Sequence, residues 1–293
     1  MVTITKHGVF PGKKLKGVER YKRLYHFTSF DTFVKIWLTK KLRFSPTKNV
    51  NDILEARTSV ALHNPQQQPL MYAFFDCKAK YKQISLTMDY DSYMYGCMAS
   101  MMWGYYADKR KGVCIQLDFE KLNLAKPLLF GPVKYVKYLQ HSVYLDPKIK
   151  SIQDLNKFIR KNKQTLFFTK DKSWAGENEY RILSDSEDFL DITDAITCIY
   201  LTEFDSTECL LVEKLVSDTV PVKCIRYNER KGNLAIPVLV DTKKIRTQFE
   251  EAKNNPDNVL NHISSQAKEH YLSLKDDVSA SLLKDFYTFP KKS

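Results

Sequence analysis

Short runs of apolar residues, many alternating with polar ones, favour β-strands over much of this chain. Val113 to Asp118 is the clearest run, because Gly112 opens it with a turn signal. Arg23 to Thr28 and residues 179–184 also fit strands that enter a core. Patterns of the same kind predict further strands at 42–45, 70–77, 82–87, 133–139, 196–202, 221–227 and 234–240.

Other segments carry apolar residues at helical spacing. In residues 30–40, Phe33 and Trp37 belong to such a stripe, Ser29 is a suitable N-cap, and Asp31 falls in the first turn. The remaining helices are predicted at 51–62, 93–107 and 152–168, with one or two more in 243–289.

Together these elements predict an α+β fold with a split, largely antiparallel β core, flanking helices and a C-terminal helical segment. We expect a basic flexible arm at residues 1–20, a main domain at 21–242 and the helical segment at 243–293. The apolar stripe of that last segment predicts packing on the main domain, or an interface for a second copy or another protein.

The composition is that of an ordinary folded chain, with 43% hydrophobic and 27% charged residues among 293. No apolar run approaches the roughly 18 residues of a membrane span, and the N-terminus lacks a secretory pattern. The six cysteines form no Cys-x-x-Cys pair, so we expect reduced packing thiols, no metal site and a cytoplasmic protein.

The formal net charge is +12, with lysines concentrated near the start of the chain. Such a charge attracts polyanions, so RNA, DNA or a dinucleotide is a candidate partner. A lysine-rich solvated surface with no partner explains the same charge equally well.

The segment Trp174-x-x-Glu177-x-Glu179-Tyr180-Arg181 carries the most chemistry. On a strand its three charged residues would share one face, with the carboxylates ~6.5 Å apart. Their repulsion of about 2.5 kcal/mol would raise one carboxyl pKa by nearly two units, although Arg181 offsets much of it. Such a pair suits the stabilisation of an oxocarbenium-like centre. The alternative is a surface ion network on an edge strand.

His26 is either a core histidine or a donor to a ribose hydroxyl or phosphate, and Thr28 and Ser29 after it could bind an anion. Trp103 and Tyr106 are either core residues or a platform for a nicotinamide or a base. Asn51, Asp52 and Glu55 could join the same site, or they could cap a helix and pair with lysines. Lys170 and Trp174, just before the acidic pair, could line the same cleft. The P-loop, Rossmann, Gly-x-Ser-x-Gly and His-Glu-x-x-His patterns are absent.

These clusters resemble, in order, the motifs of a bacterial family described only as a domain of unknown function, over roughly residues 23–240. The matching motifs are Tyr25-His26-Phe27-Thr28-Ser29, Asn51-Asp52-x-x-Glu55, Met102-Trp103-x-x-Tyr106-Ala107-Asp108 and Lys170-x-x-x-Trp174-x-x-Glu177-x-Glu179-Tyr180-Arg181. The chain departs from the pattern at Ile53, where proline is usual, and at Tyr105 and Arg110, where histidine is usual.

The family is in turn distantly similar to ADP-ribosyltransferases of the DarT-like group, which modify nucleic acid. That similarity implies the fold of an ADP-ribosyltransferase, NAD as a substrate, and a role as a toxin or in antiviral defence. It also implies that Glu179 holds the ribose hydroxyl, that Glu177 positions or deprotonates the acceptor, and that His26 binds the adenosine-side ribose. Arg181 and Lys170 would contact phosphates or order the glutamates.

Two other functions remain open. A metal-dependent nuclease could use Asp52, Glu55, Glu177 and Glu179 around Mg²⁺. A non-catalytic protein could bind nucleic acid or a nucleotide through its basic surface.

Overall fold

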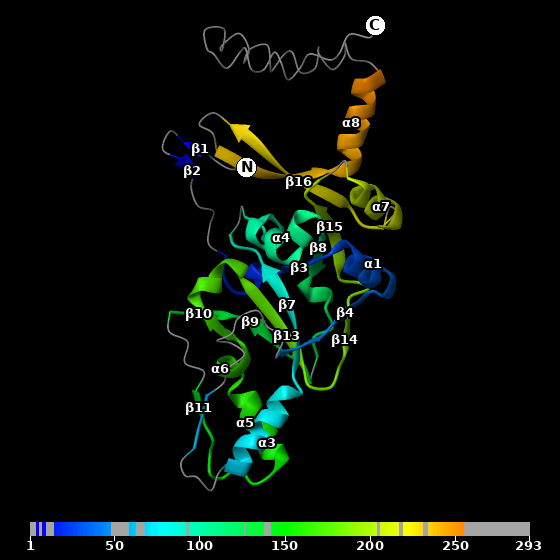
Figure 1. The fold of residues 1–293 in the computed structure, drawn as a ribbon. Coiled ribbons are helices and arrows are strands. Elements are labelled where there is room, and N and C mark those ends of the chain that lie inside the picture. The colour runs from blue at the N-terminus through cyan, green and yellow to red at the C-terminus, as the bar shows by residue number, and fades with distance from the viewer. Residues whose placement is uncertain are drawn as a thin grey trace. The chain divides into compact units, whose positions relative to one another are not determined.

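The computed structural model describes residues 4–5, 8–9, 15–47, 59–62, 68–91, 94–125, 127–137, 142–203, 206–216, 219–230 and 234–254 (Figure 1). Contacts divide the chain into two units, Met1–Leu239 and Val240–Ser293. In the second unit the described helix is α8 (Thr242–Asn254). No helix of the described residues is long and apolar enough to cross a membrane.

The core of the first unit is a nine-stranded sheet in the order β17-β16-β15-β8-β3-β7-β13-β9, with β5 also pairing with β7. Apart from the parallel pair β15 and β16, every neighbour with a defined register is antiparallel. The strands are β3 (Arg23–Thr28), β5 (Ser45–Pro46), β7 (Lys82–Met88), β8 (Val113–Asp118), β9 (Leu129–Pro132), β13 (Glu179–Ser184), β15 (Ile196–Leu201), β16 (Val222–Arg230) and β17 (Leu234–Asp241).

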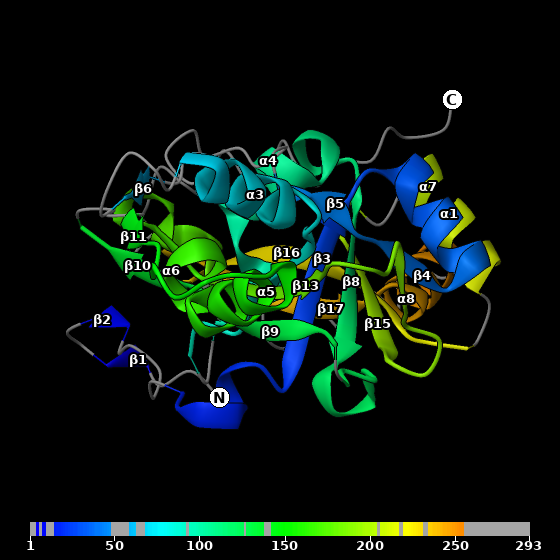
Figure 2. The ribbon, with the colours of Figure 1, turned by 90° about the horizontal axis from the view of Figure 1, so that it is seen from below.

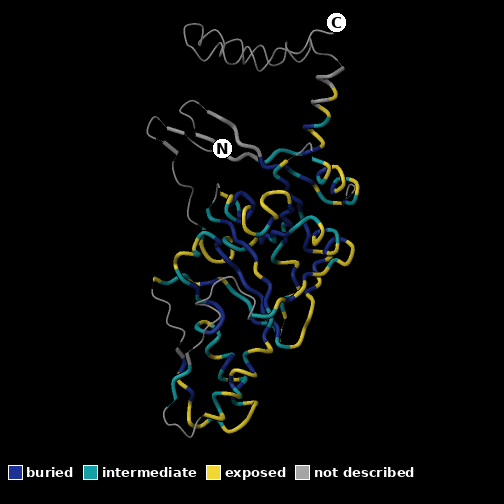
Figure 3. The backbone as a smooth tube through the Cα atoms, viewed as in Figure 1, coloured by how far each residue is buried: buried dark blue, intermediate teal, exposed yellow. Residues whose placement is uncertain are grey.

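Helices cover the sheet through three apolar clusters. Buried residues of α1 (Phe30–Thr39) and α7 (Thr207–Val216) pack with Leu24 and its neighbours, and the two helices lie side by side in Figure 2. Residues of α4 (Ser100–Tyr106) pack with Tyr25 and Phe27, on the opposite face of β3. Helices α3 (Gln68–Ala79), α5 (Ile152–Lys161) and α6 (Lys163–Phe167) form the third cluster. Figure 3 shows the central strands buried along much of their length.

Shorter elements complete the description of the first unit. Four small sheets pair β1 (Ile4–Thr5) with β2 (Gly8–Val9), β4 (Lys41–Arg43) with β14 (Phe189–Asp191), β6 (Ser59–Ala61) with β11 (Ser142–Tyr144), and β10 (Lys134–Val136) with β12 (Thr169–Asp171). The 3-10 helices are η1 (Gly17–Arg20), η4 (Gly96–Met98), η5 (Asp108–Arg110), η6 (Phe119–Lys121) and η7 (Lys172–Glu177).

The sheet opens between β3 and β7. Strand β3 pairs with β8 along its whole length, but it pairs with β7 only through Leu24–Met88 and Tyr25–Thr87. At the other end of β7, β5 pairs with Gln83 and Lys82. Among the described strands, none pairs with Ser85 between these two pairings on this side, and Ser85 is exposed.

The mixed fold with a largely antiparallel sheet is confirmed, as are many of its elements. Ser29 caps α1 by accepting a hydrogen bond from the backbone N–H of Thr32 at 3.3 Å, and Asp31 lies in the first turn. The strands predicted at 23–28, 82–87, 113–118 and 179–184 are present, and the helical prediction for 152–168 is met by α5 and α6.

Residues 70–77 were wrongly predicted as a strand, since they lie within α3. The aromatic residues of this segment favour strands. However, its buried residues are Phe74 and Cys77, three positions apart, which is the spacing of one helix face. The helix predicted at 51–62 is also wrong at its end, where Ser59–Ala61 form strand β6, and residues 51–58 lie outside the described part.

Candidate functional site

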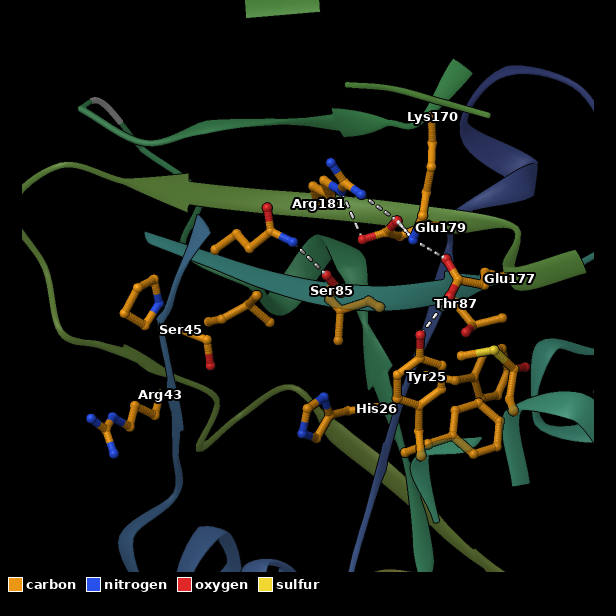
Figure 4. Close-up of a pocket in the computed structure, with 17 residues that line it drawn as sticks. Tyr25, His26, Arg43, Ser45, Ser85, Thr87, Lys170, Glu177, Glu179 and Arg181 are labelled. Atoms are coloured by element: carbon orange, nitrogen blue, oxygen red, sulfur yellow. Dashed lines mark hydrogen bonds and ion pairs between the residues drawn. The ribbon is translucent and has the colours of Figure 1, made fainter. Parts of the chain in front are cut away.

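A cavity of about 260 Å³ lies at the opening between β3 and β7 (Figure 4). Its walls come from seven segments of the chain. They are Tyr25, His26 and Phe27 of β3, Arg43 of β4, Ser45 and Pro46 of β5, residues 83–87 of β7, Met102 and Tyr106 of α4, Lys170 of β12, and Glu177, Glu179 and Arg181 at and before β13. We call Lys170, Glu177, Glu179 and Arg181 the acid–base cluster.

Arg181 and Glu179 form a two-pronged ion pair in this cluster. Both lie on β13, two positions apart and therefore on one face. Arg181 Nε donates to Glu179 Oε1 and Arg181 Nη2 to Glu179 Oε2, each at 2.7 Å. Arg181 Nη1 also donates to the Phe167 carbonyl at 2.6 Å, which ties β13 to the end of α6. Because the guanidinium is 1% exposed, its charge depends on these acceptors.

Glu177 reaches the cluster from outside the strand, contrary to the prediction that it shares a strand face with Glu179. It is the last residue of η7, and Asn178 after it has a left-handed backbone with φ of 45°. The Asn178 amide donates to the carbonyls of Met88 and Asp89, which fixes this turn beside β7. Glu177 and Glu179 thus share one cavity wall although only one lies on β13.

Two donors hold Glu177 in place. Lys170 Nζ lies 2.6 Å from Oε2, and the Tyr106 hydroxyl donates to Oε1 at 2.5 Å. Lys170 Nζ also lies 3.7 Å from Glu179 Oε2, so one ammonium bridges the two carboxylates. Lys170 and Arg181 were expected either to contact phosphates or to order the glutamates. The contacts described here fit the second role.

The repulsion expected between the two carboxylates does not raise the pKa of Glu179. Burial alone would raise its pKa, but the charge and hydrogen bonds of Arg181, the charge of Lys170 and a hydrogen bond from Ser85 lower it below its ordinary value. Glu179 is therefore ionised at neutral pH.

His26 lies across the opening from the acid–base cluster (Figure 4). Desolvation lowers the pKa of His26 to about 4, and a hydrogen bond with the backbone of Ser85 opposes this only in part. The ring is therefore neutral at pH 7, with one nitrogen donating to that backbone and the other able to accept. Toward a ribose hydroxyl it would act as an acceptor, whereas the sequence suggested a donor.

The polar face of β7 was missed as part of the site. All of residues 83–87 border the cavity, and of these Ile84 and Leu86 also belong to the apolar core. The polar residues Gln83, Ser85 and Thr87 alternate with them along the strand. The Gln83 side-chain amide donates to the Ser85 hydroxyl at 3.1 Å. The strict alternation of polar and apolar residues in 83–88 is the signal that could have identified this wall.

Several predicted site residues lie apart from the cavity. Trp103 is buried and donates through Nε1 to the Cys97 carbonyl at 2.7 Å, which is the core role weighed for it. Trp174 packs against Lys170, whose Nζ lies 4.7 Å from the ring centroid. Thr28 is buried and Ser29 caps α1, so neither lines the cavity. Asn51, Asp52 and Glu55 lie outside the described residues.

Within the described ranges, no group of three or more His, Cys, Asp or Glu residues is arranged to hold a metal ion. All six cysteines are free and buried. The nuclease hypothesis would need Asp52 and Glu55, so it stays a prediction.

Comparison with known families gives one match. Residues 102–182 match a family model described as "Protein of unknown function (DUF2971)". This segment includes Tyr106 and the whole acid–base cluster, so the site has most of its charged residues inside the matched region. Neither the curated proteins nor the solved structures include a match to the chain.

Proposed function

We propose that this protein breaks the nicotinamide–ribose bond of NAD and transfers ADP-ribose to an acceptor. One observation carries the proposal: two buried carboxylates, Glu177 and Glu179, are held side by side on a cavity wall that faces a neutral histidine. In a glycosidic cleavage, positive charge develops at the ribose C1′, and ionised carboxylates in a site of low polarity stabilise it.

The size and lining of the cavity are compatible with one end of a dinucleotide. At about 260 Å³ it lies just below the roughly 300–1,000 Å³ of pockets that enclose whole drug-sized ligands. The nicotinamide riboside would therefore enter, while the pyrophosphate and adenosine stay toward the mouth. Exposed Arg43 borders the cavity and is suited to meet a phosphate.

The reaction can be written with chain residues alone. When the C1′–N bond breaks, its electron pair goes to the pyridine ring and nicotinamide leaves as a neutral molecule. The carboxylates stabilise the remaining cation, and the acceptor adds at C1′ and loses a proton. The charge of +12 favours RNA or DNA as that acceptor, and a toxin or antiviral defence role is part of the same proposal.

The test is incubation of the purified protein with NAD, alone and with RNA, DNA or cellular protein. We expect release of nicotinamide, with loss of NAD reduced by about a hundredfold or more when both glutamates are replaced in a Glu177→Gln/Glu179→Gln variant. A matched control is Asp188→Asn, which changes an exposed carboxylate paired with Lys82 outside the cavity. The proposal would fail if the Glu177→Gln/Glu179→Gln variant consumed NAD as fast as Asp188→Asn. It would also fail if the wild-type protein consumed no NAD.

A further inference from the structure

The two carboxylates of the acid–base cluster differ in how many donors they already satisfy. Glu179 accepts from Arg181 at both oxygens, has Lys170 Nζ at 3.7 Å and accepts from Ser85. A carboxylate offers about four lone-pair positions. Three hydrogen bonds therefore occupy the Glu179 carboxylate, and Lys170 adds an ion pair at a longer distance.

Glu177 accepts from fewer groups. Its partners among the described residues are the Tyr106 hydroxyl at 2.5 Å and Lys170 Nζ at 2.6 Å, one at each oxygen. On the same count of about four positions, acceptor capacity remains on Glu177. Because Glu177 lines the cavity, that capacity is available to a molecule bound there.

A neighbouring hydroxyl also lacks a partner. Thr87 is 1% exposed, lines the cavity, and its Oγ1 has no hydrogen-bond partner among the described residues. Thr87 lies opposite Glu179 in the register of β7 and β13, and Glu177 borders the same cavity. Buried hydroxyls nearly always have a partner. A hydroxyl of a bound ligand, placed between Thr87 and Glu177, would satisfy both residues.

We infer that Glu177 is the carboxylate that meets the substrate, that Thr87 binds the same sugar hydroxyl, and that Glu179 is a positioning residue. This assignment rests on the proposed function and reverses the roles that the sequence resemblance implied for the two glutamates. Glu177 stabilises the cation at C1′ and then takes the proton of the acceptor as the new bond forms. Glu179 acts through Lys170, which its charge holds against Glu177.

The test compares Glu177→Gln with Glu179→Gln in steady-state NAD cleavage and in thermal unfolding. For Glu177→Gln we expect a fall in kcat of about a hundredfold or more with little change in KM. Its Tm should fall less than that of Glu179→Gln, because Lys170 keeps Glu179 as a second counter-charge at 3.7 Å. For Glu179→Gln we expect a clearly lower Tm, because buried Arg181 loses its counter-charge, but a fall in kcat of less than about tenfold below that Tm.

A second variant keeps the test decisive if Glu179→Gln does not fold. In Glu179→Met/Arg181→Met the whole pair becomes apolar at similar volume, which buried pairs often tolerate. We expect this variant to fold and to keep kcat within about tenfold of the wild type. A fall as large as that of Glu177→Gln, in a folded variant, would overturn the assignment and leave the proposed function standing.

Thr87→Val tests the hydroxyl subsite. The Tm without ligand should stay equal or rise, because the lost hydroxyl had no partner. KM for NAD should rise about tenfold, and an NAD analogue lacking the matching ribose hydroxyl should bind wild type and variant alike. The control is Thr197→Val, whose hydroxyl accepts from Gln116 at 2.7 Å outside the cavity. It should lower Tm and leave KM unchanged.

Three outcomes count against the inference. An unchanged KM in Thr87→Val would mean that a water molecule alone satisfies that hydroxyl. Equal losses of kcat from the two glutamine variants at unchanged Tm would remove the distinction between Glu177 and Glu179. A wild-type protein that does not consume NAD would overturn the proposed function and this assignment together.

Discussion

Arg181 holds Glu179 by two parallel hydrogen bonds of 2.7 Å, and both side chains are almost fully buried. The pair is the fixed point of the acid–base cluster. Arg181 anchors it to the backbone of α6, and Lys170 links it to Glu177. Substitutions in this pair should therefore affect mainly the stability of the protein, whereas substitutions at Glu177 should affect mainly its chemistry.

Arg181→Met should reduce the free energy of unfolding by about 3–5 kcal/mol, because it leaves the Glu179 carboxylate buried without its main counter-charge. Urea unfolding measures this change. The double variant with Glu179→Met should recover most of the loss. Asp188→Asn, which breaks the exposed pair with Lys82, should leave the unfolding midpoint almost unchanged. A midpoint in Arg181→Met equal to that of the wild type would contradict the role given to the pair.

Acid should destabilise the protein through His26. The folded-state pKa is about 4 and the ordinary value 6.5. Between these pH values the unfolded chain binds a proton that the folded chain does not, so stability falls as the pH drops from 6.5 toward 4. At about 1.4 kcal/mol per pH unit the total is about 3 kcal/mol.

Urea unfolding at several pH values between 7 and 4.5 measures this loss, and His26→Gln should flatten the dependence. Glu179, whose pKa is lowered from 4.5, contributes its own loss only below that range. The same slope in His26→Gln and the wild type would assign the proton uptake to another group.

Gly96→Ala should disturb the cavity wall. A Cβ at Gly96 would lie 2.5 Å from Cδ2 of the Tyr25 ring and 2.8 Å from the Met88 carbonyl oxygen. Such overpacking costs about 1–3 kcal/mol, and the ring that lines the cavity must move. Gly104→Ala in α4 is the matched control, since nothing lies within 4 Å of its Cβ position. It should gain about 0.5–1 kcal/mol. Urea unfolding of both variants compares them, and a neutral Gly96→Ala would contradict the packing.

The two predicted aromatic platforms should behave differently. Trp103→Phe removes the donor to the buried Cys97 carbonyl, so it should cost about 1–3 kcal/mol of stability and leave the proposed NAD cleavage by the folded protein nearly unchanged. Tyr106→Phe removes a donor to Glu177. It should therefore lower kcat clearly and change Tm little. Tyr105→Ala, at a side chain 70% exposed, should change stability by less than about 0.5 kcal/mol. Tm and kcat are measured for all three variants. A loss of kcat at unchanged Tm in Trp103→Phe, with a loss of Tm at unchanged kcat in Tyr106→Phe, would contradict the positions given to these two side chains.

The strands and the first helix were predictable from the sequence because their signals are local. Ser29 is a typical N-cap and so predicts the start of α1. Short apolar runs, some alternating with polar residues, predict β3, β8 and β13. Helix α3 was not predicted because its aromatic residues favour a strand. The helical spacing of Phe74 and Cys77 is evident only from the structure, where both pack in one cluster with residues of α5.

The chemistry of the site depends on contacts between distant segments, which local patterns do not encode. Alternation placed Glu179 and Arg181 on one face, but not the geometry that lowers the pKa of Glu179. Lys170 comes from another strand and Tyr106 from α4, and neither pairing with Glu177 follows from sequence spacing. The opening at Ser85 exists because β3 leaves β7 after two residue pairs, and strand divergence carries no sequence motif.

The division of labour along β7 has an evolutionary consequence. Ile84 and Leu86 anchor the strand in the apolar core, while Gln83, Ser85 and Thr87 face the hollow. Mutations on the hollow side therefore leave every anchoring side chain of this strand in place. If the proposed function holds, related proteins can change their substrate through these three positions and keep the same fold.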